Sequence, residues 1–161
     1  MDAPAAKALR TRRPVDSSAL AGTVGYRLRL AQLTVFQDFI ETFEELDIRP
    51  ADYAVLLLIG DNPGCKQGEI AAALGIKRAN FVALMNRIEE RGLAERRARS
   101  SDRRSHALHL TDKGAQFVER MKELQTGHEA RLVAALGGEA DRDRFLSYLE
   151  RIIEGKWTGR T

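Results

Sequence analysis

The chain has little of what extracellular and membrane proteins need. Its 161 residues include one cysteine, Cys65, so no disulfide can form within the chain, and this favours a reducing cytoplasm. No apolar run reaches the roughly 18 residues of a membrane-spanning helix, which predicts that the chain does not enter a membrane. Residues 1–16 are basic and lack the apolar segment of a secretory signal.

The residue sets that carry catalysis or bind metals are also missing. His106 and His109 fall on opposite faces of a predicted strand, and His128 lies far from both on a predicted helix. No phosphate-binding glycine loop and no nucleophile with a neighbouring base appears, and the carboxylates lie on polar helix faces. The sequence therefore predicts that the protein is not an enzyme and uses no metal and no cofactor.

Positive charge is concentrated near the middle of the chain. The net charge is only +3, but residues 77–104 hold nine Lys/Arg against four acids, whereas residues 14–76 hold four against nine. A local basic block predicts contact with nucleic acid better than the net charge does. Its densest part, "RRARSSDRRS", has the composition of either a disordered tail or a hairpin that touches a polyanion. The neighbouring segments decide between the two.

Helical periodicity covers most of the chain before this block. Residues 1–16 show none and are interpreted as a flexible basic arm, which is either simply frayed or in contact with DNA. Residues 18–47 carry an apolar stripe wider than one face, so this helix needs a second packing partner, and a second copy of the chain is the simplest one. Three shorter helices follow, beginning at Pro50, at "QGEIAAALG" and at "KRANFVALMNRIEERG".

After Gly92 the apolar period changes from about 3.6 residues to about 2. "LAERRA" and "HALHLT" are predicted strands, joined by the loop "RSSDRRS". A hairpin directly after three short helices, the last of them basic, is the order of a winged helix-turn-helix. Thr111 is predicted to cap a further helix, which "GGEA" ends before a last one.

The predicted fold is therefore mostly α, with a two-stranded wing. We expect one domain over residues 17–154 and a tail over residues 155–161. Within the domain the winged helix-turn-helix covers about residues 48–111, and N- and C-terminal dimerisation helices cover about 18–47 and 112–154.

The basic helix has an apolar face and a polar one. Phe81, Leu84, Met85 and Ile88 recur at the spacing of a buried face. On the opposite face arginine can bond guanine, asparagine can read adenine, and a small alanine admits a thymine methyl, although a merely solvated face would look similar. Arg91 is expected to contact phosphate. The predicted recognition residues are Lys77, Arg78, Ala79, Asn80, Ala83, Asn86 and Arg87.

The arginines of the predicted hairpin have a different target. Narrow minor grooves attract arginine because their negative potential is enhanced, and Arg104 is the best candidate near the tip. Asp102 would be repelled by phosphates, so we expect it to pair with an arginine and hold the loop in one shape. The predicted wing residues are Arg96, Arg97, Arg99, Asp102, Arg103 and Arg104.

The segment "GLAERRARSSDRRSHALHLTDKG" resembles the wing of the MarR family of bacterial transcriptional regulators. In that family a GLV-E-R stretch, a D-x-R wing and an L-x-LT-x-x-G ending recur at this spacing. "RPADYAVLLLIG" and "KQGEIAAALGIKRANFVALMNRIEERG" are similar to the family's second helix and helix-turn-helix, so the resemblance covers about residues 18–154. It places Asp102 and Arg104 at the D-x-R positions, while Lys66 and Lys77 stand where Ser or Thr is common.

The resemblance implies a homodimeric repressor on a pseudo-palindromic operator, released from double-stranded DNA by a small ligand, frequently an aromatic acid or a phenolic. Such a ligand needs an apolar cavity with a few polar groups. An aromatic acid or its coenzyme A thioester would suit aromatic walls and an arginine, although each aromatic residue would equally suit plain core packing. The predicted pocket residues are Tyr26, Arg27, Arg29, Phe36, Phe39, Phe43 and Tyr53.

Two further alternatives stay open at this point. Cys65 is either structural or redox-active, since the neighbouring Lys66 mildly favours a thiolate. The leading function is a cytoplasmic, ligand-responsive repressor. The alternative is a non-catalytic winged-helix module for architectural DNA binding or protein contact. A repressor would protect two half-sites about one helical turn apart on DNA, whereas the architectural module would bind diffusely.

Overall fold

The computed structural model describes residues 15–99 and 102–155, and for residues 99 and 102–105 it describes the backbone alone. Contacts within the chain divide it into two units, one up to Thr34 and one from Val35 onward. The predicted mostly helical class with a two-stranded wing is confirmed. None of the helices in the described part is long and apolar enough to span a membrane.

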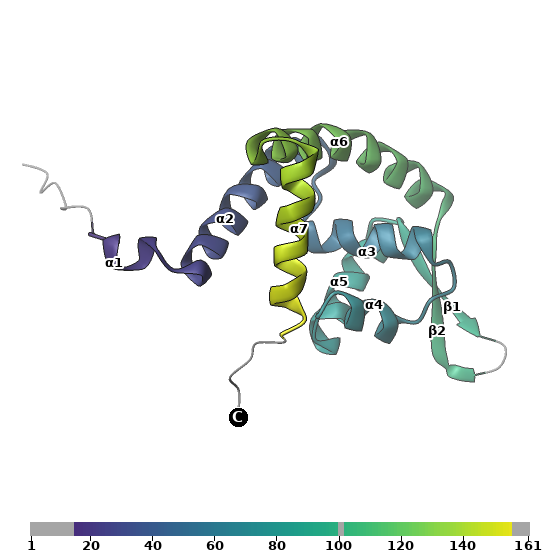
Figure 1. Cartoon of the computed structure of the whole chain (residues 1–161). Helices are drawn as coiled ribbons and strands as arrows, with labels where there is room; N and C mark the ends of the chain where they lie inside the picture. The colour runs from purple at the N-terminus through teal and green to yellow at the C-terminus, as the bar shows by residue number, and fades with distance from the viewer. Residues whose placement is uncertain (1–14, 100–101, 156–161) are drawn as a thin grey trace, which may run out of the picture. The chain divides into compact units, whose positions relative to one another are not determined.

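Figure 1 shows the order of the elements along the chain. They are α1 (Ser18–Ala21), α2 (Val24–Thr42), the 3-10 turn η1 (Glu44–Leu46), α3 (Pro50–Asp61), α4 (Gln67–Ala73), α5 (Arg78–Glu90), β1 (Ala94–Arg99), β2 (Asp102–Leu110), α6 (Asp112–Leu136) and α7 (Glu139–Ile153).

The expected single helix over residues 18–47 is corrected, because α1, α2 and η1 are separate elements. The first break lies at Gly22 and Thr23. The N–H and the hydroxyl of Thr23 both donate to the carbonyl of Leu20, at 2.9 Å each. A threonine that bonds back to the preceding turn competes with helix continuation, and glycine weakens a helix further.

Helices α3, α4 and α5 form the predicted helix-turn-helix. Pro50 occupies the first turn of α3, and Gly75 and Gly92 adopt the left-handed conformation just after α4 and α5, with φ of 62° and 67°. Lys66 gives α4 no side-chain cap, but its own N–H donates to the Glu69 carboxylate at 2.7 Å. The glutamate thus supplies half of a capping box where the family's usual Ser or Thr is replaced.

Strands β1 and β2 pair antiparallel, with Ala94 opposite Leu110 and Arg99 opposite Asp102. The predicted strands are confirmed, but β2 begins four residues earlier than expected, so residues 102–105 belong to a strand and not to a loop. The register is regular up to Ala98 opposite His106 and shifts between Ala98 and Arg99, so the pairing of Arg99 with Asp102 leaves a bulge in β2. The hairpin projects away from α3, α4 and α5 (Figure 1).

The core lies between α3, the inner face of α5, the base of the wing and α6. Val55, Leu56 and Ile59 of α3 are fully buried, as are Leu108 of β2 and Met121 of α6. The predicted inward face of α5 is confirmed. Its buried residues are Phe81, Leu84, Met85 and Ile88.

Helix α6 approaches the base of the wing closely at Gly114. A Cβ on Gly114 would lie 1.7 Å from the carbonyl oxygen of Leu93. Thr111 secures the same junction: its hydroxyl donates to the Gly92 carbonyl at 2.7 Å, and its Oγ1 accepts from the Gly114 N–H at 3.0 Å. The predicted Thr111 cap is thus confirmed, and it also ties α6 to the start of the wing.

Gly114→Ala is expected to lower the free energy of unfolding by about 1–3 kcal/mol or more, because the added methyl group forces α6 away from Leu93. Urea denaturation of the full chain, followed by circular dichroism, measures the change. Gly127→Ala in the same helix is the matched control, since the nearest atom to its added Cβ lies 3.7 Å away. The control should be neutral or gain up to about 1 kcal/mol. Equal stabilities of the two variants would contradict the close contact.

Candidate functional site

The N-terminal half of α5 presents its polar face to solvent. Lys77, which precedes the helix, and the residues of its first two turns that point away from the core are exposed. The side chains of Arg78 and Asn80 make no hydrogen bond or ion pair with any other described residue. The structure therefore leaves this part of the predicted recognition surface open. Its exposed members are Lys77, Arg78, Ala79, Asn80 and Ala83.

The C-terminal half of α5 is different, because its polar side chains bind the rest of the chain. Nη2 of Arg87 donates to Oδ1 of Asp52 at 2.8 Å. Arg96 of β1 donates from Nη2 to Oδ1 of Asn86 at 3.0 Å and forms an ion pair with Glu89. The predicted recognition residues Asn86 and Arg87 and the predicted wing residue Arg96 thus hold the helix to α3 and to the wing.

Arg91, expected on phosphate, is also committed within the chain. Its guanidinium donates to the carbonyls of Leu46 and Asp47, at 2.9 and 2.8 Å, and lies 5.2 Å from the ring centre of Phe117. These carbonyls end η1, where Asp47 turns into the left-handed conformation with φ of 45°. Contact of Arg91 with phosphate stays a prediction. The Arg91 donors satisfy helix-end carbonyls that have no partner of their own in the turn.

The described side chains of the wing end before its tip. Arg97 pairs with Glu95 beside it on β1 at 2.7 Å, and both are exposed. The backbones of Arg99, Asp102, Arg103 and Arg104 lie on the two strands. The expected pairing of Asp102 with an arginine lies outside the described side chains and stays a prediction.

Part of the predicted aromatic pocket comes together in the second unit. Phe39 and Phe43 of α2 stack with ring centres 4.3 Å apart, and Tyr53 of α3 meets both edge-on at 5.3 and 5.2 Å. The Tyr53 hydroxyl donates to Oε1 of Gln125 on α6 at 2.9 Å, and burial raises the pKa of Tyr53, which keeps this donor protonated. His128 joins the ring cluster edge-on to Phe39.

The other predicted pocket residues do not join this cluster. Phe36 is 43% exposed. Tyr26, Arg27 and Arg29 belong to the first unit, where Nε of Arg27 donates to the carbonyl of Ala21 at 2.7 Å.

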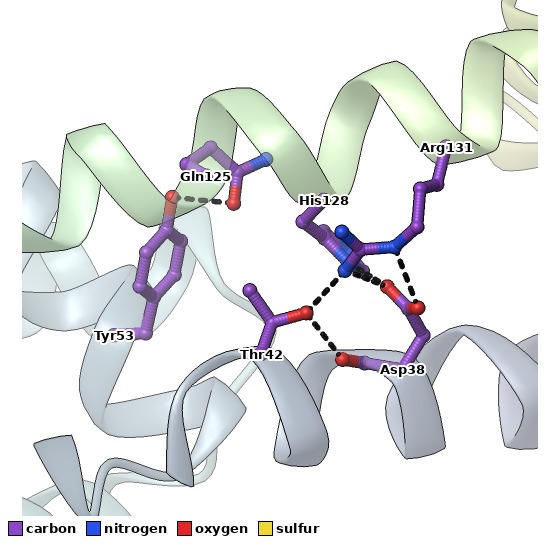
Figure 2. A network of polar contacts seen from close by, with 6 residues as sticks. All are labelled: Asp38, Thr42, Tyr53, Gln125, His128 and Arg131. Carbon is purple, nitrogen blue, oxygen red and sulfur yellow. Dashed lines mark hydrogen bonds and ion pairs between the residues drawn. The ribbon is translucent and has the colours of Figure 1, made fainter. Parts of the chain in front are cut away.

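Beside the rings lies a charged network that the sequence alone did not reveal (Figure 2). Nδ1 of the buried His128 lies 2.5 Å from Oδ2 of Asp38. Arg131 grips the same carboxylate with Nε and Nη2, at 2.9 and 2.8 Å, and also donates to Thr42. The arginine and histidine hydrogen bonds hold the pKa of Asp38 down at about 2. The network joins α2 to α6 on the flank of the aromatic cluster.

The thiol of Cys65 lies in a setting that disfavours redox sensing. Cys65 is partly buried, and burial, with a smaller contribution from the charge of Glu69, raises its pKa. A redox sensor needs a lowered pKa and an accessible thiolate. Among the described residues there is also no cluster of His, Cys, Asp or Glu that could hold a metal ion.

Asp38→Asn is expected to lower the free energy of unfolding near neutral pH by about 1 kcal/mol, because the buried His128 and Arg131 lose their shared carboxylate. A carboxyl whose pKa is lowered on folding stabilises above its unfolded pKa of 3.8 and loses this effect as the pH falls towards about 2. The stability difference from the wild type should therefore shrink below about pH 4, as the Asp38 carboxylate of the wild type loses its charge.

Urea denaturation over this pH range measures the difference. Glu119→Gln, which removes an exposed pair with Lys122 on α6, is the matched control and should change stability by less than about 0.5 kcal/mol. A difference between Asp38→Asn and wild type that grows on acidification would show that the carboxylate does not stabilise the fold.

The chain is similar in sequence and in fold to known transcriptional regulators. The profile described as MarR family matches residues 46–105. The chain is 31% identical over 135 residues, 83% of this chain and 81% of the relative, to the putative transcriptional regulatory protein for the hcr operon of Thauera aromatica.

Two solved structures are similar over almost their whole length. The transcriptional repressor CouR bound to a 23-mer DNA duplex is 46% identical, with a TM-score of 0.82, over 88% of this chain and 99% of that one. CouR bound to p-coumaroyl-CoA is 44% identical, with a TM-score of 0.79, over 87% and 98%.

Proposed function

Since the chain belongs to the MarR family of transcriptional regulators, we propose that it is a ligand-responsive repressor that binds double-stranded DNA as a homodimer. The observation that carries the proposal is the open polar face at the start of α5, from Lys77 to Ala83, beside a projecting hairpin. A helix of this chemistry can read base edges in the major groove while a wing follows the adjacent minor groove. The similarity to a repressor bound to a DNA duplex supports this docking mode.

The homodimer is supported by apolar side chains that the single chain leaves in water. Helix α7 has no buried residue, and Leu146, Tyr148 and Ile153 are 48%, 57% and 81% exposed. In the first unit Leu20 and Val24 are exposed as well. Apolar groups gathered on terminal helices favour a second copy of the chain as their cover. Two copies would place two recognition helices on half-sites one helical turn apart.

For the effector we propose an aromatic acid or, better supported, its coenzyme A thioester. The ring cluster of Phe39, Phe43 and Tyr53, which is packed into the core, is the aromatic part of the proposed site, and polar groups lie beside it. Arg27 and Arg29 are exposed cations of the first unit, and phosphate contact by them is a separate proposal from the ring cluster. The similarity to a repressor bound to p-coumaroyl-CoA supports the thioester.

The protein is further proposed to act in the cytoplasm without catalysing a reaction. Regulators of this family act by binding, and none of the chemistry proposed for α5, the wing or the ring cluster requires a bond to be made or broken.

A duplex selected from a random-sequence pool by the full chain should carry two half-sites about one turn apart, and nuclease footprinting should show two protected segments. On this duplex Arg104→Ala should weaken binding markedly, through loss of a minor-groove contact. Asn80→Ala should instead change the preference for one base pair per half-site by about 1–3 kcal/mol.

Arg144→Ala removes an exposed arginine of α7 and is the charge control: it should bind DNA like the wild type, with its dimeric state checked by sedimentation. Diffuse protection with no selected sequence would favour the architectural module over the repressor. Wild-type affinity of Arg104→Ala would refute the assignment of Arg104 to the wing contact, and an equal loss on every sequence would make Asn80 a backbone contact.

p-Coumaroyl-CoA should raise the thermal unfolding temperature and weaken binding to the selected duplex. At a hundred times its Kd the added stability is about 2.7 kcal/mol. p-Coumaric acid and coenzyme A alone are the controls for the two halves of the ligand. Arg27→Ala and Arg29→Ala should weaken binding of the thioester but not of the free acid. Stabilisation by neither thioester nor acid would refute the proposed effector class.

A further inference from the structure

Arg87 lies on the recognition helix, yet one of its donors is bound inside the chain and another is buried. Nη2 donates to Asp52 at 2.8 Å. Nε is buried and has no hydrogen-bond partner among the described residues. Bidentate recognition of guanine needs two donors from one guanidinium, side by side and both free. With one Nη2 proton given to Asp52 and Nε buried, the side-on pair of donors that includes Nε is not available to a base, and Nη1 is left as the freest donor.

The partner of Arg87 has no alternative to this pairing. Asp52 lies in the first turn of α3, and only 9% of its side chain is exposed, against 40% for Arg87. A carboxylate removed from water needs a compensating charge and hydrogen bonds, and removal of only one partner leaves the other charge buried and unpaired. The ion pair therefore fixes the position of α5 against α3 more firmly than a surface pair would.

Three neighbours of Arg87 at the C-terminal end of α5 also have partners within the chain, although Asn86 remains exposed. Asn86 and Glu89 bind Arg96 at the base of the wing, while Arg91 binds the end of η1. By contrast Arg78 and Asn80, near the start of α5, are exposed and have no side-chain partner among the described residues. The helix is thus divided into an anchored C-terminal half and an open N-terminal half.

The turn of α3 that carries Asp52 also contacts the aromatic cluster. Tyr53 follows Asp52 in the same turn of α3, packs against Phe39 and Phe43, and donates to Gln125 of α6. A single helical turn therefore holds the recognition helix on one side and the ring cluster on the other.

We propose that Arg87 is a positioning residue rather than a base-reading one. The Asp52–Arg87 ion pair holds α5 at the angle at which its open N-terminal half, Arg78 to Ala83, reads DNA. This inference rests on the proposed DNA-binding function and assigns sequence discrimination to Arg78 and Asn80.

A double-mutant cycle on the selected duplex tests this assignment. Asp52→Ala and Arg87→Ala should each weaken binding about tenfold, and the double variant should bind no more weakly than Arg87→Ala, because both changes remove one interaction. When the duplex is changed one base pair at a time, Asp52→Ala and Arg87→Ala should alter the base preference in the same way. Asp52 is buried and negatively charged, so it cannot contact DNA itself and can change the preference only through Arg87.

Arg104→Ala, which is not on α5, is the control: its effect should multiply with that of Asp52→Ala. The effect of Arg78→Ala should instead be smaller in the Asp52→Ala variant than in the wild type, because the ion pair positions Arg78. Titration of each variant with DNA at concentrations far above the Kd measures the fraction of protein that can bind. This fraction separates a loss of affinity from a loss of folded protein. If Asp52→Ala binds like the wild type or tighter while Arg87→Ala loses preference at one base pair, Arg87 reads DNA and the inference is wrong. If the wild type selects no duplex, the proposed function itself fails.

A spectroscopic measurement gives an independent answer. In the ¹⁵N-labelled full chain, the Nε signal of Arg87 should stay in place when the selected duplex is added, whereas that of Arg78 should shift. Arg87→Lys and Arg78→Lys assign the two signals. A shift of the Arg87 signal as large as that of Arg78 would show that Arg87 contacts DNA.

Discussion

The packing of one face of α5 onto α3 and the base of the wing is the constraint on which the rest of the structure depends. Phe81, Met85 and Ile88 lose almost all contact with water there. Full burial of one such side chain contributes about 1.5–3 kcal/mol, so together these residues fix the rotation of the helix about its axis. Because the helical repeat is 3.6 residues, burying this face leaves Arg78, Asn80 and Ala83 in solvent.

Ion pairs and hydrogen bonds then fix the tilt and the axial position of α5, which apolar packing alone leaves adjustable. A helix held only by apolar contacts can slide or tilt at a small cost, whereas ion pairs and hydrogen bonds have a defined length and direction. Arg87 ties the helix to Asp52 on α3, Arg96 ties the wing to the helix, and Arg91 ties the end of the helix to η1. Basic residues in the central block therefore serve the fold as well as nucleic-acid contact.

Periodicity predicted most of the fold, but not which polar groups meet. The order of helices, the hairpin and the Thr111 cap follow from patterns within a few residues, and so do the exposed positions at the start of α5. The partners of Arg87 and Arg91 lie 35 to 45 residues away along the chain, and no local pattern encodes such a pairing. His128 illustrates the same limit, since helical periodicity places it on a helix but does not point to Asp38, 90 residues away.

The sequence by itself determined the class of the protein: a basic recognition helix and a wing, flanked by helices whose apolar stripes are wider than one packing partner covers. Apolar burial and backbone hydrogen bonding depend on composition and spacing, which are local and can be read along the chain. Only the tertiary structure decided which arginines remain open and which are bound. A guanidinium on a polar helix face has the same sequence signature in both cases, and the difference arises when folding brings Asp52 out of water and next to Arg87.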